Sequence, residues 1–364
     1  MQLSSTLDWL IDVAHESDGA ENFLAELGAR LVADGLPLAG GALTLAVPDP
    51  LIARRTWLWR SGSRQVIEAL GFAPAAPGAA QEATHFGESG RGWLAGIAAG
   101  AVHEDVVGPR PDGPSLAWIG PLTFTTREIR ALREAARFAT APLAALAARA
   151  AMRATLEAYL GRRTAARVLA APLRRDIGET IQAALLFADL RGFTALSETQ
   201  PPSMVIAALG AWFDRIAGAV HAFGGEVLKF IGDGLLAIFP VGAAGPPAAC
   251  EAALRAASAA RVGMRRLDQE RERQGLPPLP FGIALHLGEM LWGNIGAADR
   301  LDFTAIGSAV NLVSRLEGLC RPLKQTVLVS GAFAAETNAP LNALGMHAMR
   351  GIAFPIAVFA VPER

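Results

Sequence analysis

The chain is poor in cysteine and nearly free of net charge. Its 364 residues hold two cysteines, and 33 basic residues offset 34 acidic ones to leave a formal charge of −1. Cys250 and Cys320 are isolated from any CxxC motif or histidine cluster, which excludes a disulfide framework and a zinc site and favours reduced thiols in a cytoplasmic protein. A charge near zero gives no general attraction to nucleic acid or to an anionic membrane.

Long apolar runs are also lacking, although 52% of the residues are hydrophobic. The most apolar stretches, residues 92–102 and 138–148, are rich in alanine or glycine and are too short to cross a bilayer. The first five residues have neither a basic start nor an apolar core, so no secretory signal is expected. The sequence therefore predicts a globular protein without a membrane span.

Residues 1–125 are expected to form a small α/β domain. Helical apolar spacing covers residues 7–14 and 20–33, and residues 41–47 and 55–60 have the pattern of a strand and its hairpin partner. Residues 72–81 and 107–114, which are rich in proline, glycine and alanine, are predicted to be loops, and residues 115–121 a further strand.

A long helix is expected to follow, because Thr125-Thr126-Arg127-Glu128 is a capping box. Pro142 should kink or interrupt this helix. One apolar stripe runs along it, and this stripe could pack on its own domain or across a dimer axis: Ile129, Leu132, Ala136, Ala139, Leu143, Leu146 and Ala150. Residues 126–180, which include a basic stretch, are taken as a helical linker.

The order of these elements resembles that of a GAF-type sensor domain, whose last helix leads into an output domain. An unrelated α/β dimerisation module is the alternative.

Residues 181–364 are expected to form a second domain with a split βαβ, ferredoxin-like pattern and additions to it. The whole chain is thus predicted to be α/β, or more narrowly α+β. The expected strands cover residues 182–189, 226–231, 234–239, 281–287, 290–295, 301–306, 326–329 and 355–361, and the helices cover 203–222, 247–273 and 308–318.

Two aspartates in this second domain stand beside glycine at the ends of apolar, strand-like runs. Asp189 ends one run and precedes a turn with Gly192, and Asp233 lies in a hairpin signal, Gly232-Asp233-Gly234. Each alone is typical of a simple turn. If their strands are neighbours, as the split βαβ topology requires, the two carboxylates meet and can hold a pair of hard divalent cations, the usual apparatus for displacement at a phosphate.

Four segments that include these aspartates resemble, in order, the motifs of the class III nucleotidyl cyclases. They are residues 187–194 (FADLRGFT), 224–237 (GGEVLKFIGDGLLA), 282–289 (GIALHLGE) and 306–317 (IGSAVNLVSRLE). The resemblance implies that Asp189 and Asp233 bind two Mg²⁺ or Mn²⁺ ions per site, with Leu190 beside them. It also implies that the backbone from Leu190 through Gly192 and Phe193 to Thr194 covers a triphosphate.

The same resemblance places Lys229 and Thr304 at the two positions that read the purine. Lysine favours adenine, because an ammonium donates to adenine N1 but meets the N1–H of guanine. Threonine at the second position resembles the class IIIb subgroup, some members of which respond to bicarbonate, so bicarbonate or another small molecule is an open regulator. Asp302, on the same strand face, is an alternative to Thr304 in register.

The remaining matched positions lie in the last motif and beyond it. Asn311 and Arg315, four residues apart on one helix face, match the ribose-orienting asparagine and the arginine that stabilises the transition state. Arg350 lies near a position where some relatives place a basic residue on the terminal phosphates. His286 reads as a hydrogen-bonded core histidine, and Glu289 and Glu317 as structural residues.

The resemblance implies an adenylate cyclase that converts ATP to 3′,5′-cyclic AMP and pyrophosphate. In this family each site takes its metal residues and its purine-reading residues from opposite subunits, so a homodimer is expected, with the N-terminal domain regulating it. A guanylate cyclase and a non-catalytic, nucleotide-responsive regulator are the alternatives.

Overall fold

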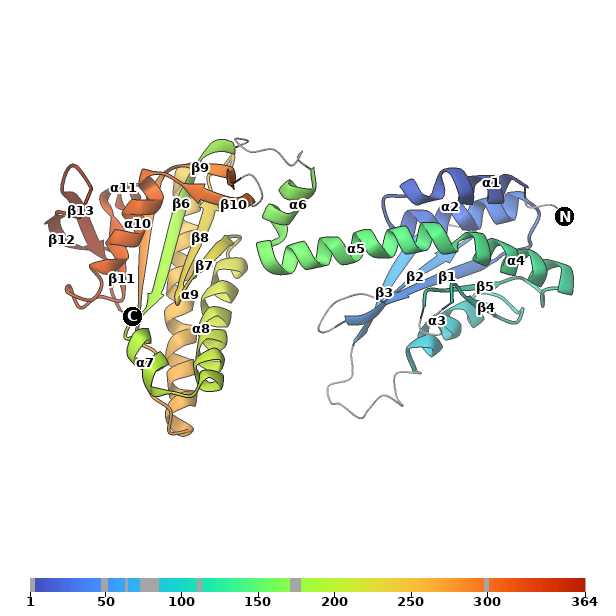
Figure 1. The fold of residues 1–364 in the computed structure, drawn as a ribbon, viewed down its shortest axis with the longest axis horizontal. Coiled ribbons are helices and arrows are strands. Elements are labelled where there is room, and N and C mark those ends of the chain that lie inside the picture. Colours follow the sequence, from blue (N-terminus) through green and yellow to red (C-terminus); the bar gives the residue numbers. More distant parts are fainter. Residues whose placement is uncertain are drawn as a thin grey trace. The chain divides into compact units, whose positions relative to one another are not determined.

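The computed structural model describes residues 4–46, 52–62, 65–72, 85–109, 113–170, 178–297 and 301–363. The chain divides into two compact units, Met1–Leu156 and Glu157–Arg364, and each has its own hydrophobic core (Figure 1). Both units mix helices with an antiparallel or largely antiparallel sheet, so the predicted α/β class is confirmed.

The first unit is built on a five-stranded antiparallel sheet of order β3-β2-β1-β5-β4. Side chains of α1, α2 and α4 fill the core on one sheet face, and Leu94 of α3 packs on the other. In chain order the elements are α1 (Ser4–Asp12), the 3-10 helix η1 (Ala14–Glu16), α2 (Ala20–Ala33), β1 (Gly40–Ala46), β2 (Ile52–Arg60), β3 (Val66–Phe72), α3 (His85–Ala95), β4 (His103–Val106), β5 (Ser115–Ile119), α4 (Thr126–Phe138) and α5 (Thr140–Leu160).

The helix over residues 20–33 and the hairpin of β1 with β2 are confirmed. The strands β3 and β4 and the helix α3 were not predicted. The sequence of α3, HFGESGRGWLA, contains three glycines, so its helix depends on tertiary packing rather than on intrinsic propensity. Most of the loop predicted over 72–81, and residues 110–112 of the second loop, lie outside the described residues.

The predicted interruption at Pro142 is confirmed, and it falls one turn before the proline. α4 ends at Phe138 and α5 begins at Thr140, because Pro142 has no N–H to give to the Phe138 carbonyl and its ring would collide with that group. The capping box is present, with the Glu128 amide donating to Thr125 Oγ1 and the Thr125 amide donating to Glu128 Oε2 at 2.7 Å. The stripe packs in the core of its own unit through Leu132, Ala136, Ala139, Leu143 and Leu146.

The second unit carries an eight-stranded sheet of order β12-β13-β11-β9-β6-β8-β7, with β10 paired to β9 alone. Its elements are α6 (Arg162–Ala170), β6 (Gly178–Leu190), α7 (Phe193–Thr199), α8 (Pro202–Ala222), β7 (Glu226–Ile231), β8 (Gly234–Pro240), α9 (Gly245–Arg273), β9 (Phe281–Gly296), β10 (Leu301–Ile306), α10 (Ser308–Gly318), β11 (Val327–Ser330), α11 (Gly331–Ala334), β12 (Asn342–His347) and β13 (Ile356–Ala360).

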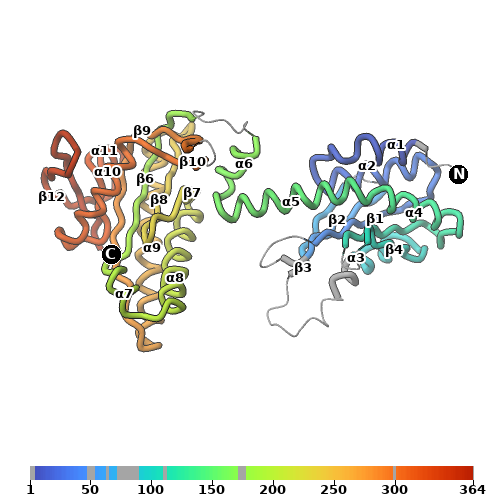
Figure 2. The backbone as a smooth tube through the Cα atoms, in the orientation of Figure 1, coloured from blue at the N-terminus to red at the C-terminus, as the bar shows by residue number. Residues whose placement is uncertain are grey.

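The ferredoxin-like prediction is confirmed by the strand order β9-β6-β8-β7, in which β8 lies antiparallel between β6 and β7. Figure 2 follows the backbone through these strands. Two predicted strands, 281–287 and 290–295, are one continuous strand, β9, because Gly288 stays in register opposite Ala183 of β6. The strand β12 and the short helix α11 were not predicted.

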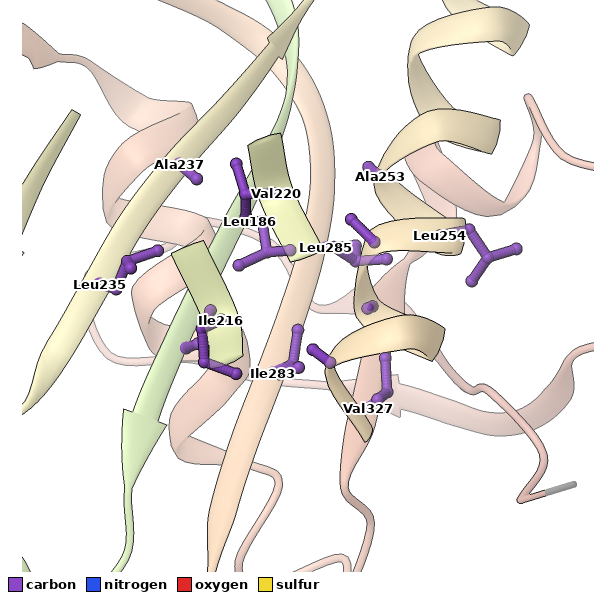
Figure 3. Close-up of a cluster of buried hydrophobic side chains, with 14 of the residues drawn as sticks. Leu186, Ile216, Val220, Leu235, Ala237, Ala253, Leu254, Ile283, Leu285 and Val327 are labelled. Carbon is purple, nitrogen blue, oxygen red and sulfur yellow. The ribbon is translucent and has the colours of Figure 1, made fainter. Parts of the chain in front are cut away.

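The sheet of the second unit has two different faces. Alternate residues of β6, such as Leu186, point toward α8 and α9 and join Ile216, Leu285 and Ala253 in a large apolar core (Figure 3). The other residues of β6, such as Leu185, point toward α10. Because side chains alternate along a strand, Asp189 lies on the α10 face with Leu185.

One helix of the second unit, α8, is long and apolar enough to cross a membrane by length and composition, with a mean hydropathy of 1.4 and 28% of that window buried. Its buried residues Ala208, Trp212, Ile216 and Val220 recur every four positions and belong to the core shared with α9 and the sheet. This pattern is that of a helix packed on a globular core.

Leu186 tests the core of the second unit. Its side chain is fully buried, so Leu186→Ala should lower the free energy of unfolding by about 2–5 kcal/mol in a urea titration. Ile206→Ala is the matched control, because Ile206 on α8 is 70% exposed and its loss should change stability by about 0.5 kcal/mol or less. Equal effects of the two substitutions would contradict this packing.

Candidate active site

Asp189 and Asp233 meet at one end of the sheet. Asp189 is the penultimate residue of β6, and Asp233 lies in the two-residue turn that joins β7 to β8, the strand paired with β6. Gly232 in this turn has a φ of 62°, which a residue with a side chain rarely adopts. The buried Trp212 of α8 donates from its indole nitrogen to the Asp233 carbonyl at 3.0 Å and so fixes the turn against the core.

Glycines on both strands that neighbour β6 make room for acidic side chains, Asp189 on one side and Glu317 on the other. On β8, a Cβ at Gly234 would lie 3.2 Å from Asp189 Oδ1. On β9, Gly282 is the direct partner of Asp189, and a Cβ there would collide with the carboxylate of Glu317. Side chains at these two positions would crowd the acidic groups, so the Gly-Asp-Gly signal in the sequence has a steric reason as well as a turn reason.

The two aspartates repel one another electrostatically. Burial, followed by the charge of Asp233 and a hydrogen bond with it, raises the pKa of Asp189 from 3.8 to about 6. A divalent cation between the carboxylates would remove this repulsion. Mg²⁺ and Mn²⁺ prefer oxygen ligands and usually combine one or two carboxylates with water and substrate phosphates, so the donor set fits such ions. No group of three or more His, Cys, Asp or Glu side chains suited to a metal is found among the residues that the structure describes.

Glu317 of α10 is a third acidic group that the sequence led us to regard as structural only. It is 9% exposed, and burial together with the charge of Asp189 raises its pKa to about 7, while Arg191 acts in the opposite direction. Its proximity to Asp189 comes from the tertiary packing of α10 over Gly282, so no local sequence signal marks it.

The turn after Asp189 exposes backbone amides next to the acidic pair. Gly192 has a φ of 76° and precedes α7, so the first amides of that helix, beginning with Phe193 and Thr194, have no carbonyl partner within the helix. Leu190 lies at the very end of β6. Free amides of this kind bind phosphate oxygens readily.

Lys229 and Thr304 are brought together from two strands that are not paired with each other. Lys229 Nζ on β7 donates to Thr304 Oγ1 on β10, and it also lies 3.9 Å from Asp302 Oδ2. Thr304 is buried and Asp302 is exposed. Thr304 and Asp302, the two candidates for the second purine-reading position, therefore both face the Lys229 ammonium group, as their spacing of two residues on one strand predicts.

Asn311 and Arg315 lie one turn apart on α10. The side chain of Asn311 is exposed, and Arg315 Nη1 donates to the backbone carbonyl of Arg350. Arg350 is exposed in the loop between β12 and β13, so the structure brings the Arg350 backbone, rather than its guanidinium group, to Arg315.

The geometry of α10 separates two halves of the predicted site within one chain. Residues two apart on a helix point in nearly opposite directions, so Arg315 faces away from the side on which Glu317 approaches Asp189. Among the described residues, no hydrogen bond or ion pair joins Lys229, Thr304, Asn311 or Arg315 to either aspartate.

His286 is a core residue, as the sequence indicates. It is buried on β9, its Nδ1 lies 2.7 Å from Ser330 Oγ, and burial lowers its pKa to about 4. An imidazole that stays neutral over the physiological range and bonds a hydroxyl has a structural role here.

Comparison with known proteins supports this geometry. Residues 177–349 match the family described as the Adenylate and Guanylate cyclase catalytic domain. Among curated relatives, an adenylate cyclase of Anabaena cylindrica is 32% identical over 160 residues, covering 43% of this chain and 31% of its own length. Adenylate cyclase 1 of Rhizobium meliloti is 34% identical over 151 residues, covering 42% of this chain and 23% of its own. The chain thus spans about a quarter to a third of the length of these relatives.

Solved structures of cyclases are also similar to parts of this chain. The adenylyl cyclase CyaB from P. aeruginosa is 27% identical, with a TM-score of 0.47 over 52% of this chain and 97% of that one. A bacterial light-regulated adenylyl cyclase, 18% identical, aligns with a TM-score of 0.54 over 88% of this chain and 93% of its own. The GAF-type resemblance of the first unit stays a prediction. Residues 177–349 of this chain belong to the family of adenylate and guanylate cyclase catalytic domains.

Proposed function

We propose that the protein is an adenylate cyclase that converts ATP to 3′,5′-cyclic AMP and pyrophosphate. The observation that carries the choice of ATP is the hydrogen bond from Lys229 to Thr304 within a domain of this family. An ammonium group beside a hydroxyl offers a donor to adenine N1 and an acceptor to the adenine amino group. Guanine presents an N1–H and a carbonyl at these positions, so it fits the pair poorly.

The acidic pair gives the reaction its metal requirement. Asp189 and Asp233 would hold two Mg²⁺ or Mn²⁺ ions, and such ions, when bound, would lower the pKa of the ribose 3′-hydroxyl and neutralise charge on the triphosphate. The free amides that follow Leu190, at Gly192, Phe193 and Thr194, would receive phosphate oxygens. The raised pKa of Asp189 supports this role. Burial and the charge of Asp233 destabilise the ionised carboxylate, and a bound cation would relieve that destabilisation.

Two residues of α10 act on the reacting groups. Asn311 would hold the ribose so that the 3′-oxygen lies in line with the α-phosphorus, which turns binding energy into orientation. Arg315 would meet the negative charge that develops at the α-phosphate as pyrophosphate leaves. Arg350, whose carbonyl already positions Arg315, would add positive charge near the terminal phosphates.

A homodimer would complete each site. Within one chain Arg315 faces away from the side of α10 that approaches Asp189, so a site needs Asn311 and Arg315 from a second copy. Phe230 and Ile231, which directly follow Lys229 on the edge strand β7, are 54% and 47% exposed. Apolar side chains at a sheet edge support burial against a partner subunit.

The first unit would regulate this activity through α5 and α6, which join the two units in sequence. The nature of its signal stays open, and bicarbonate is one choice to test because of Thr304. Adding bicarbonate to the assay below addresses that choice directly.

The shared site predicts complementation between inactive chains. Asp189→Ala and Arg315→Ala should each abolish cyclic AMP formation. An equal mixture should recover roughly a quarter of the wild-type rate, because about half of the dimers are mixed and each has one intact site of two. A mixture of Asp189→Ala with Asp233→Ala is the control and should stay inactive, since both changes damage the same half. If the first mixture is as inactive as the control, the shared-site proposal fails.

The purine-reading pair predicts the substrate. The wild-type chain should cyclise ATP in preference to GTP when Mg²⁺ or Mn²⁺ is supplied. Lys229→Glu should lower kcat/KM for ATP by about 10- to 100-fold, since it removes a charged hydrogen bond worth about 1.5–3 kcal/mol. Thr304→Val should weaken ATP use and Thr304→Ser should preserve it. A preference for GTP would favour a guanylate cyclase, and no metal-dependent turnover of either nucleotide would favour a non-catalytic regulator.

The raised pKa of Asp189 means that its ionised carboxylate, which the proposed metal site needs, lowers the stability of the metal-free fold. Its folded pKa of about 6 lies above the unfolded value of 3.8, so the folded state binds more protons and stability is lost as pH rises from about 4 to about 6. In EDTA at pH 7.5, Asp189→Asn should therefore be more stable than wild type by about 1 kcal/mol, after allowing for the solvent exposure of a half-buried group. Urea unfolding at pH 7.5 and pH 4 measures this, and the difference should vanish at pH 4. A variant less stable than wild type at pH 7.5 would contradict it.

A further inference from the structure

The connector helix α6 is fastened to the start of β7 by a buried carboxylate. Glu226, the first residue of β7, is 5% exposed, and its Oε1 accepts from the amide of Thr164 at 3.1 Å and from the Thr164 hydroxyl at 3.2 Å. Arg163 Nε lies 3.8 Å from Oε2. Gly161, at the N-cap position of α6, has no side chain to accept a hydrogen bond from the first amides of the helix. Glu226 takes this role by accepting from the Thr164 amide.

A second set of contacts joins α6 to strands β6 and β9. The guanidinium carbon of Arg167 lies 4.2 Å from the centre of the Trp292 ring on β9, and Arg167 Nη2 lies 2.5 Å from Glu179 Oε1 on β6. Trp292 is 3% exposed and packs edge-on against Phe303 of β10, with ring centres 5.4 Å apart. Phe303 directly precedes Thr304, and Trp292 is the ladder partner of Ala305, which follows it.

The two strands that carry Lys229 and Thr304, β7 and β10, do not share a ladder, and α6 touches β7 directly and β10 only through Trp292 of β9. Within the described part of the sheet, β7 pairs with β8 and β10 pairs with β9, and β6 lies between those two partners. No ladder joins β7 to β10 directly, so side-chain contacts help to set the distance between them. α6 contacts β7 at Glu226, three residues before Lys229, and it reaches β10 indirectly through Trp292, the β9 partner of Ala305, which packs on Phe303.

We propose that α6 is a positioning element for adenine recognition, which holds β7 and β10 at the spacing where Lys229 meets Thr304. Glu226 and Trp292 are the positioning residues on the sheet, and Thr164 and Arg167 are their partners on the helix. This inference rests on the proposed function of the Lys229–Thr304 pair.

The contacts of Glu226 couple α6 to β7. If α6 moved alone, the Glu226 carboxylate would lose both hydrogen bonds from Thr164 and its nearest cation, Arg163, so movement of α6 together with β7 is favoured. A displacement of α6 should therefore carry β7 with it. In the chain order α5 precedes α6, so a signal from the first unit that moved α6 would change nucleotide binding before it changed the chemistry at the carboxylate pair.

The test substitutes residues of α6, because Thr164 and Arg167 lie outside the strands that carry Lys229, Thr304 and the two aspartates. The full-length Thr164→Val and Arg167→Ala double variant should raise the KM for ATP about tenfold, since each change removes a contact worth roughly 1 kcal/mol. The metal concentration for half-maximal rate should stay within about twofold of wild type, because Asp189 and Asp233 are untouched. Calorimetry with a non-hydrolysable ATP analogue should show the same loss of affinity without turnover.

Two further variants separate coupling from simple damage. A Thr164→Ser chain keeps the hydroxyl and should have the wild-type KM for ATP, whereas a Thr164→Val chain should have a raised KM. Arg255→Ala removes an exposed ion pair with Glu251 on α9 and should leave every parameter unchanged. A fall in kcat with unchanged KM and unchanged analogue affinity, or a KM within about twofold of wild type, would overturn the proposal.

Failure of this inference is distinct from failure of the proposed function. If the wild-type chain does not cyclise ATP with metal, the function itself is wrong. If wild type is active and the α6 variants bind ATP as tightly as wild type, the function stands and α6 does not position the pair.

Discussion

The space around Asp189 is the constraint on which the site depends. The strands on both sides of β6 carry glycines here: a Cβ at Gly234 on β8 would lie 3.2 Å from Asp189 Oδ1, and Gly282 on β9, the ladder partner of Asp189, leaves the space that Glu317 fills. The space on β8 lets the carboxylate lie close to the turn that holds Asp233, and the space on β9 admits Glu317 from α10. The resulting crowding of acidic groups destabilises the fold when these groups are ionised, and this is the expected cost of the proposed metal site.

Because side chains alternate along β6, the two faces of the sheet carry different groups. One face of β6 joins α8 and α9 in an apolar core, and Trp212 extends from that core to fix the turn at Asp233. Asp189 lies on the opposite face with α10, and Lys229 meets Thr304 at the far edge of the sheet. The core on the α8 and α9 side therefore supports the acidic pair from behind, and loss of Trp212 would disturb the turn at Asp233.

Local signals predicted much of this arrangement. The hairpin after Lys229, the break at Pro142 and the split βαβ order all follow from turn residues, proline geometry and apolar period. What could not be predicted depends on contacts between distant segments. The glycine-rich α3 is stabilised by the burial of Leu94, and Glu317 and Glu226 look like ordinary surface acids until α10 and α6 are packed over them. Periodicity carries no information about such partners.

The helix α10 gives this division a consequence for assembly. It carries Asn311 and Arg315 on a face directed away from the acidic pair, and Glu317, only two residues beyond Arg315, beside the Asp189 of its own chain. In the proposed homodimer each copy of α10 would thus touch both sites, the one in its own chain through Glu317 and the partner's through Arg315. A rigid helix of 11 residues cannot shift one of these groups without shifting the other. Cation binding at one site, if it moved Glu317, would therefore also move Arg315 in the second site. This is a physical route for coupling between two identical sites.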